Sequence, residues 1–105
     1  MALDGDWHII IDSPVGKQQV LVSLAADGDR LTGTLVNLAN NMSTDIFDGT
    51  ADGDDLRWKV RMQQLKMTLT FTMLVAGDTI SGKVKAGIFG HFTATGERRN
   101  REDAL

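Results

Sequence analysis

The stretch that decides the fold reads Leu56-Arg57-Trp58-Lys59-Val60-Arg61-Met62, with apolar side chains alternating with charged ones at every second position. A second stretch, Met67-Thr68-Leu69-Thr70-Phe71-Thr72-Met73, repeats the pattern with threonine in place of the charged residues. Successive side chains of a β-strand point to opposite faces, so each stretch predicts a strand with one buried and one exposed face. No segment of the chain shows a convincing helical period.

Turn-forming segments divide the rest of the chain into pieces of strand length. Asp-Gly pairs recur in them, and glycine reaches the positive φ of a tight hairpin without a steric cost. The turns at 13–16, 27–29, 37–41, 52–54, 63–66, 76–78 and 85–87 predict eight strands, at 6–13, 17–26, 29–37, 42–51, 54–62, 66–75, 78–86 and 88–98. Because every connection is short, we expect consecutive strands to pair as a meander.

The two halves of the chain resemble each other. Gly28-Asp29 and Gly33 match Gly77-Asp78 and Gly82, in each case 49 positions later. The segment 7–11 similarly matches 58–62, which predicts that Trp7, Ile9 and Ile11 face the core while His8 and Ile10 face outward. The same alignment sets His91 against Thr44 and Phe92 against Asp45. We interpret Asp48-Gly49-Thr50 as the end of a strand and not as a functional site.

Composition limits the classes of function. The 105 residues are enough for one domain, and the hydrophobic share of 42% is enough for one core. A net charge of −3 argues against a nucleic-acid partner, which requires a basic face. With no cysteine and two histidines, a disulfide framework, a thiolate nucleophile and a zinc site are not expected. We therefore expect no metal and no cofactor.

The ends of the chain complete this description. Residues 1–98 are predicted to form the domain and 99–105 a frayed, charged tail. The N-terminus lacks the basic and apolar stretches of a secretory leader, and no apolar run approaches the length of a membrane helix. We therefore expect a cytoplasmic protein that has no membrane partner.

Eight strands with one apolar face hide that face in a sandwich or in a closed barrel. Gly5-Asp6-Trp7 opens the first strand and Arg98 ends the last. These residues resemble the motif of the calycin superfamily, which comprises lipocalins, fatty-acid-binding proteins and avidins. That resemblance implies a lipocalin- or streptavidin-like, eight-stranded antiparallel up-and-down barrel. It also implies that Arg98 packs against Trp7 and closes the barrel, where a guanidinium can stack on an indole.

The whole chain is also similar to a family of small, uncharacterised bacterial lipocalin-like domains. The matching motifs are mostly turns and glycines, at Pro14 and Gly16, 28–33, 77–82, 85–90 and 96–98. They are specific for the fold and nearly silent on function.

The hairpins of such a barrel alternate between its two ends. The end that holds Trp7 and Arg98 also carries the tight acidic turns, so we expect it to be closed. The other end carries longer apolar connections, with Val15 and Leu65 among their residues, and suggests the mouth of a ligand site or a dimer contact. The ligand-binding residues predicted there and on the inner face are Trp58, Met62, Met67, Leu69, Phe71, Leu38, Met42, Ile88, Phe89 and Phe92.

Two residues are candidates for proton transfer. His91 lies near the predicted mouth, and a histidine beside an apolar cavity can act as an acid or base near neutral pH. Asp45 lies on the strand across the barrel, where an inward carboxylate would have a raised pKa. If either side chain points outward, it is an ordinary surface group.

Ile10 and Leu21 form an outward apolar pair, which suggests a homodimer.

The sequence thus predicts binding of a small apolar or aromatic molecule in the barrel. One alternative is a cofactor-free isomerase, cyclase or lyase that uses His91 or Asp45, so whether the protein is an enzyme stays open. The other alternative is a filled barrel that serves as a protein-interaction module.

Overall fold

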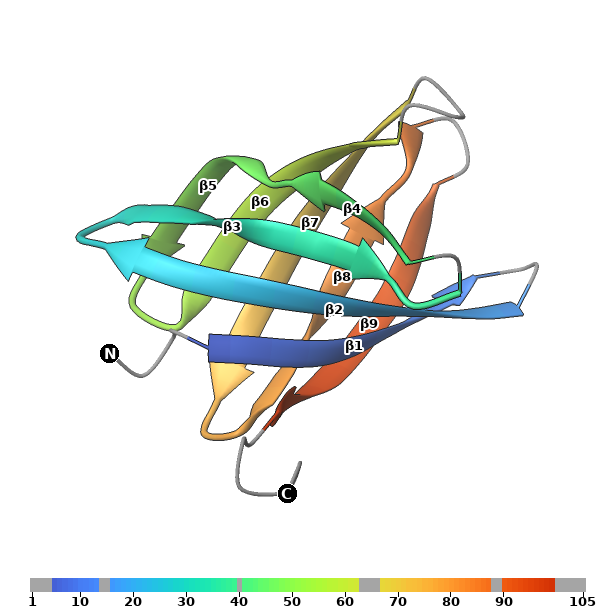
Figure 1. The fold of residues 1–105 in the computed structure, drawn as a ribbon. Helices are drawn as coiled ribbons and strands as arrows, with labels where there is room; N and C mark the ends of the chain where they lie inside the picture. Colours follow the sequence, from blue (N-terminus) through green and yellow to red (C-terminus); the bar gives the residue numbers. More distant parts are fainter. Residues whose placement is uncertain (1–4, 14–15, 40, 63–66, 88–89, 100–105) are drawn as a thin grey trace.

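The computed structural model describes residues 5–13, 16–39, 41–62, 67–87 and 90–99, and its regular elements are β-strands (Figure 1). They are β1 (Gly5–Ser13), β2 (Gly16–Asp27), β3 (Arg30–Asn37), β4 (Met42–Asp45), β5 (Phe47–Asp52), β6 (Asp55–Met62), β7 (Met67–Ala76), β8 (Thr79–Lys85) and β9 (His91–Arg99). In the described part of the chain, no helix has the length and apolarity needed to cross a membrane. The predicted all-β class is confirmed.

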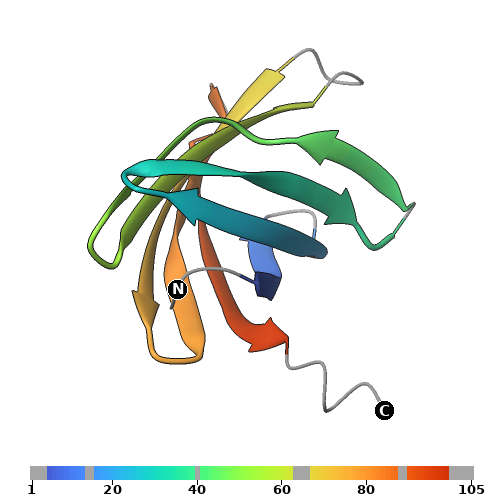
Figure 2. The same ribbon diagram turned by 60° about the vertical axis from the view of Figure 1, so that its left-hand side comes forward.

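The sheet closes on itself. From β1 to β3 and from β5 to β9, each strand pairs antiparallel with the next one along the chain. β3 pairs with both β4 and β5, and β1 pairs with β9, which joins the first strand to the last. Figures 1 and 2 show the resulting barrel from two sides. The predicted antiparallel meander barrel is confirmed, and closure leaves few unpaired strand edges.

The fourth strand differs from the prediction. We expected one strand over 42–51, but β4 and β5 are separated at Ile46, and the pairing of β5 with β6 shifts register between Phe47 and Thr50. Asp48 has φ of 51° at this point, which marks a β-bulge. Asp48-Gly49-Thr50 is therefore the site of a bulge inside β5 and not the end of a strand. A bulge bends its strand, which lets this wall of the barrel turn.

Because of the bulge, the predicted alignment of the two halves of the chain is wrong at Asp45 and Phe92. Thr44 pairs with the buried Leu35, and Phe92 pairs with the buried Val84, so both lie on the inner face. The structural counterpart of Phe92 is thus Thr44 and not Asp45. The alignment went wrong because the extra residue of the bulge changes the offset between the halves by one.

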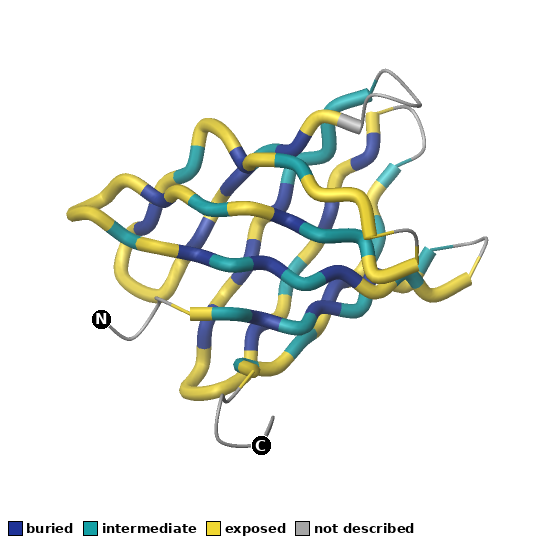
Figure 3. Tube along the Cα trace, viewed as in Figure 1, coloured by how far each residue is buried: buried dark blue, intermediate teal, exposed yellow. Residues whose placement is uncertain are grey.

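The inner face of the barrel forms the core. Figure 3 shows buried positions alternating with exposed ones along the strands. Trp7, Ile9 and Ile11 are buried as predicted, whereas His8 and Ile10 between them are half-buried. The buried set also includes Val20, Val22, Leu24, Leu31, Leu35, Ile46, Ala51, Leu56, Trp58, Val60, Phe71, Met73, Val75, Ile80, Val84, Ala86 and Ala94. Burial of this apolar face is the main force that stabilises the barrel.

Two inner-face glycines allow neighbouring strands to approach each other closely. A Cβ atom on Gly82 would lie 2.0 Å from the carbonyl oxygen of Thr72, and one on Gly96 would lie 2.3 Å from that of His8. Both distances are impossible for real atoms, so only glycine fits at these positions. Such glycines let strands coil tightly at the corners of a barrel.

Candidate ligand-binding site

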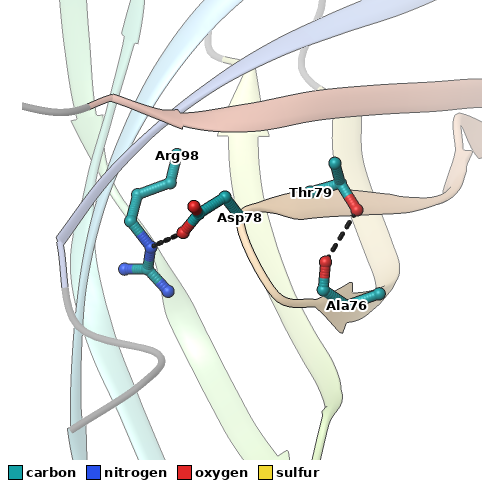
Figure 4. Close-up of polar contacts among 4 residues, drawn as sticks. All are labelled: Ala76, Asp78, Thr79 and Arg98. Atoms are coloured by element: carbon teal, nitrogen blue, oxygen red, sulfur yellow. Dashed lines mark hydrogen bonds and ion pairs between the residues drawn. The ribbon is translucent and has the colours of Figure 1, made fainter. Parts of the chain in front are cut away.

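One end of the barrel is closed by Arg98 and Trp7. The guanidinium carbon of Arg98 lies 4.3 Å from the centroid of the buried Trp7 ring, a cation–π contact. Arg98 Nε lies 3.3 Å from Asp78 Oδ1, and the backbone N–H of Arg98 donates to the Asp78 carbonyl at 2.7 Å. Figure 4 shows this pair beside the β7–β8 turn, where Thr79 Oγ1 donates to the carbonyl oxygen of Ala76. The last strand, the first strand and this turn are thereby joined over the end of the core.

The opposite end of the barrel is partly open to solvent. Along β7, the inner-face residues Met67 and Leu69 are half-buried, whereas Phe71 and Met73 further along are fully buried. Phe92, at the start of β9, is likewise half-buried although it points inward. Leu69 and Phe92 still pack against the core. The inner face is therefore partly accessible to solvent at this end of the barrel.

An aromatic row crosses the barrel just below the opening. Trp58 of β6 pairs with Phe71 of β7, Phe71 pairs with Val84 of β8, and Val84 pairs with Phe92 of β9. The rings of Trp58 and Phe71 are stacked, with centroids 5.1 Å apart and planes 15° apart. We call these four residues, three of which are aromatic, the aromatic row. One end of it is fully buried at Trp58, and the other reaches solvent at Phe92.

Polar side chains accompany the apolar ones near the opening. Gln18 pairs with Ile11, and Thr44 pairs with Leu35, so both lie on the inner face, and both are half-buried. Apolar walls that carry a few polar groups are typical of small-molecule sites. Sequence reasoning missed Gln18, Thr44 and Val84. Only the alternation within each strand could have placed them on the inner face, and the bulge obscured that pattern for Thr44.

The predicted ligand-binding residues fall into three groups. Five of them share the inner face of β6, β7 and β9: Trp58, Met67, Leu69, Phe71 and Phe92. Met42 begins β4 and is 54% exposed, and Leu38 is exposed in the turn after β3. Met62 ends β6 opposite Met67, but its side chain lies outside the described residues, as do Val15, Leu65, Ile88 and Phe89.

The two candidate acid–base residues point away from the interior. His91 is exposed and pairs with the exposed Lys85, and Asp45 is exposed and pairs with the exposed Thr34. β9 and β4 are not neighbours: the shortest path through paired strands runs from β9 over β1, β2 and β3 to β4. The structure therefore brings neither residue to the interior, and it does not bring them to each other.

A buried polar atom in the described interior lacks a hydrogen-bond partner. Trp58 is fully buried, and its indole Nε1 has no hydrogen-bond partner among the described residues. Most buried donors in folded proteins are paired, and an unpaired one costs about 1–3 kcal/mol. No grouping of three or more histidine and carboxylate side chains suited to a metal ion occurs among the described residues.

A comparison of the chain with models of known protein families and with curated proteins finds no match.

Proposed function

We propose that this protein binds a small apolar or aromatic molecule in the open half of its barrel. The observation that carries the proposal is the exposure gradient along β7, from the half-buried Met67 and Leu69 to the buried Phe71 and Met73. An apolar interior that meets water at one end favours an apolar occupant, because burying apolar surface yields about 25 cal/mol per Å². The aromatic row below offers ring faces against which such a molecule can stack.

Strand geometry sets the depth of this site. Residues two apart on one face of a strand are separated by about 6.6 Å. Leu69 and Met67 therefore extend the inner face about 13 Å beyond Phe71 toward the opening. This length suits a molecule of one or two rings, or a short terpenoid, and favours such ligands over long chains.

The first test is a fluorescence titration with an apolar dye, followed by competition with terpenoids, aromatic compounds and fatty acids. Trp58 lies in the aromatic row, so a bound molecule should also alter its intrinsic emission. We expect saturable, competable binding of about one molecule per chain, because a barrel of about eight strands has room for at most one small ligand. Absence of uptake of every member of the panel would overturn the proposal and favour a filled barrel that contacts other proteins.

A matched pair of variants locates the site. Leu69 points inward near the opening, and Leu74 lies on the outer face of the same strand with 49% exposure. Leu69→Trp should weaken dye binding by about tenfold, because an added ring overfills the open half at a cost of 1–3 kcal/mol. Leu74→Trp should leave the affinity unchanged. Equal effects of the two variants, with both proteins folded by circular dichroism, would place the dye elsewhere.

Further features of the protein are part of the same proposal. The contact between Arg98 and Trp7 supports kinship with the lipocalin-like calycins, and the absence of cysteine suits a cytoplasmic location. The half-buried outward residues Ile10 and Leu21 support a homodimer, which sedimentation at increasing protein concentration would detect. We do not propose catalysis, since His91 and Asp45 both face outward.

A further inference from the structure

The unpaired indole N–H of Trp58 bears on what the ligand must contain. Trp58 lies on the inner face of β6, between the buried Leu56 and Val60, and its ring stacks on Phe71. The whole residue is inaccessible to solvent, and its Nε1 has no hydrogen-bond partner within the described part of the chain. An indole nitrogen can only donate. Whatever satisfies it must therefore supply an acceptor inside the barrel.

Partly exposed residues of the inner face lie next to the pair of residues that holds this donor. Phe92, at the other end of the row, is half-buried, and Leu69 is half-buried directly next to Phe71 on the same face. One layer of side chains, about 6.6 Å along a strand, therefore separates the accessible interior from the Trp58–Phe71 pair. A ring inserted between Leu69 and Phe92 would bring its substituents to the level of Trp58.

We propose that the ligand is an uncharged molecule whose carbonyl or ether oxygen accepts a hydrogen bond from Trp58 Nε1. This inference rests on the binding function proposed above and narrows it to a chemical class. Two effects make the binding free energy more favourable: the hydrogen bond forms in an apolar medium, and it removes an unsatisfied donor. Hydrocarbons can fill the same space but leave the donor unpaired.

The charge of the inner face argues for a neutral ligand. Among the described strand residues, Arg98 is the one charged side chain on that face, and its guanidinium is engaged with Trp7 and Asp78 at the closed end. A carboxylate placed beside Trp58 would lose its hydration and receive one N–H donor in return. Burial of a poorly paired ion is far more costly than burial of a ketone. Fatty acids and other anions are therefore disfavoured at this site.

Three ligands of nearly equal shape separate these possibilities. They are 2-acetylnaphthalene, which is a ketone, 2-isopropenylnaphthalene, which is its planar hydrocarbon counterpart, and the anion 2-naphthoate. Their affinities for the wild-type protein are measured by calorimetry and again for Trp58→Phe, which keeps a ring but removes the donor. We expect the variant to weaken the ketone relative to the hydrocarbon by about two- to thirteenfold, the range expected for one hydrogen bond.

A second variant serves as a control for packing. Phe92→Leu removes aromatic surface from the same row without changing any donor, so it should weaken ketone and hydrocarbon by the same factor. We also expect 2-naphthoate to bind the wild-type protein at least about tenfold more weakly than the ketone, because its charge must be desolvated. An anion that binds as tightly as the ketone would overturn the preference for a neutral ligand.

A measurement on the wild-type protein covers the case in which Trp58→Phe does not fold. The chain has two tryptophans, so two indole N–H signals are expected in a ¹H–¹⁵N correlation spectrum, and that of Trp7 serves as an internal reference. Saturation with the ketone should move the Trp58 signal downfield, and saturation with the hydrocarbon should not. If both ligands bind and move the signal alike, the hydrogen bond is disproved while the binding function stands. If neither binds, the binding function itself fails.

Discussion

Arg98 contacts both Trp7 and Asp78 at the closed end of the barrel, and these two contacts differ in strength. Its guanidinium lies over the buried Trp7 ring, whereas its partner Asp78 has an 87% exposed side chain. Exposed ion pairs contribute about 0–1 kcal/mol, while a desolvated cation–π contact contributes up to about 2 kcal/mol and also brings apolar packing. The stack on Trp7 should therefore stabilise this end more than the ion pair does.

Two substitutions distinguish these contributions. Arg98→Met should lower the free energy of unfolding by about 1–2 kcal/mol, because it removes the cation above the indole. Asp78→Asn should cost about 0.5 kcal/mol or less, because its charge is already screened by water. Urea unfolding followed by tryptophan emission measures both. Equal losses, both reduced by added salt, would show that the ion pair matters more than the stack.

Trp58 shows how a single residue can carry two opposite effects. Its stacking on Phe71 stabilises the pair of strands β6 and β7 by about 0.5–1.5 kcal/mol. The N–H of Trp58, which has no partner among the described residues, destabilises the ligand-free protein by a similar amount of free energy. Such a locally unfavourable group is expected where a ligand completes the structure.

At the scale of the strands, the inner-face glycines decide how closely neighbours approach. Gly82 of β8 pairs with Met73 of β7, and an added Cβ would meet the Thr72 carbonyl oxygen at 2.0 Å and the Met73 sulfur at 2.9 Å. The first of these is a backbone atom, which cannot move aside without separating the two strands. The constraint is therefore on the sheet and not on one side chain.

Gly82→Ala should consequently destabilise the protein strongly. We expect a loss of about 3 kcal/mol, the upper end of the range for overpacking, because the backbone of β7 must move. Ser81→Ala, on the exposed face of the same strand, is the matched control and should change stability by less than about 0.5 kcal/mol. Thermal or urea unfolding measures both, and a Gly82→Ala protein as stable as the control would contradict the packing seen here.

The bulge at Asp48 explains a failure of pattern reading at the same scale. Alternation predicts inward and outward faces correctly until an extra residue enters a strand, after which every following side chain changes face. Gly49 inside the segment 42–51 is compatible with a bulge, but it does not determine where the register shifts. The partner strands β3 and β6 determine it, because both must pair with this segment at once.

At the scale of the whole molecule, closure makes the position of the chain ends unimportant for the fold. Asp6 of β1 pairs with Arg99 of β9, so the two ends of the described barrel lie side by side, as Figure 1 shows. Apart from β4, which pairs with β3 alone, each described strand has at least two neighbours around the ring regardless of where the chain begins. A cut in an exposed turn removes no strand pairing.

A circular permutant tests this property. Residue 105 is joined to residue 1, and new ends are opened between Gly53 and Asp54, both exposed in the β5–β6 turn. We expect a folded barrel with the dye affinity of the original chain, because exposed turns tolerate new termini. A permutant opened between Thr72 and Met73, inside β7, should not fold. Loss of folding in the first permutant would show that the hairpin at Gly53 is required to start the barrel.

The sequence by itself determined the class of fold and the faces of most strands, whereas the contact between Trp7 and Arg98 was expected from the resemblance to calycins. It could do so because alternation and turn chemistry are local properties, readable from a few consecutive residues. The internal match between the halves extended that reading from β6 to β1. Five of the ten predicted ligand-binding residues accordingly lie on one inner face.

Only the tertiary structure decided which residues pair across neighbouring strands, which inner-face residues are partly exposed, and which buried donor lacks a partner among the described residues. The aromatic row joins four strands whose relative register depends on closure of the whole sheet. The outward direction of His91 and Asp45 likewise depends on the start of β9 and on the bulge in β5. These features arise from pairings between distant segments, and a strand's own sequence does not record the register of its neighbours.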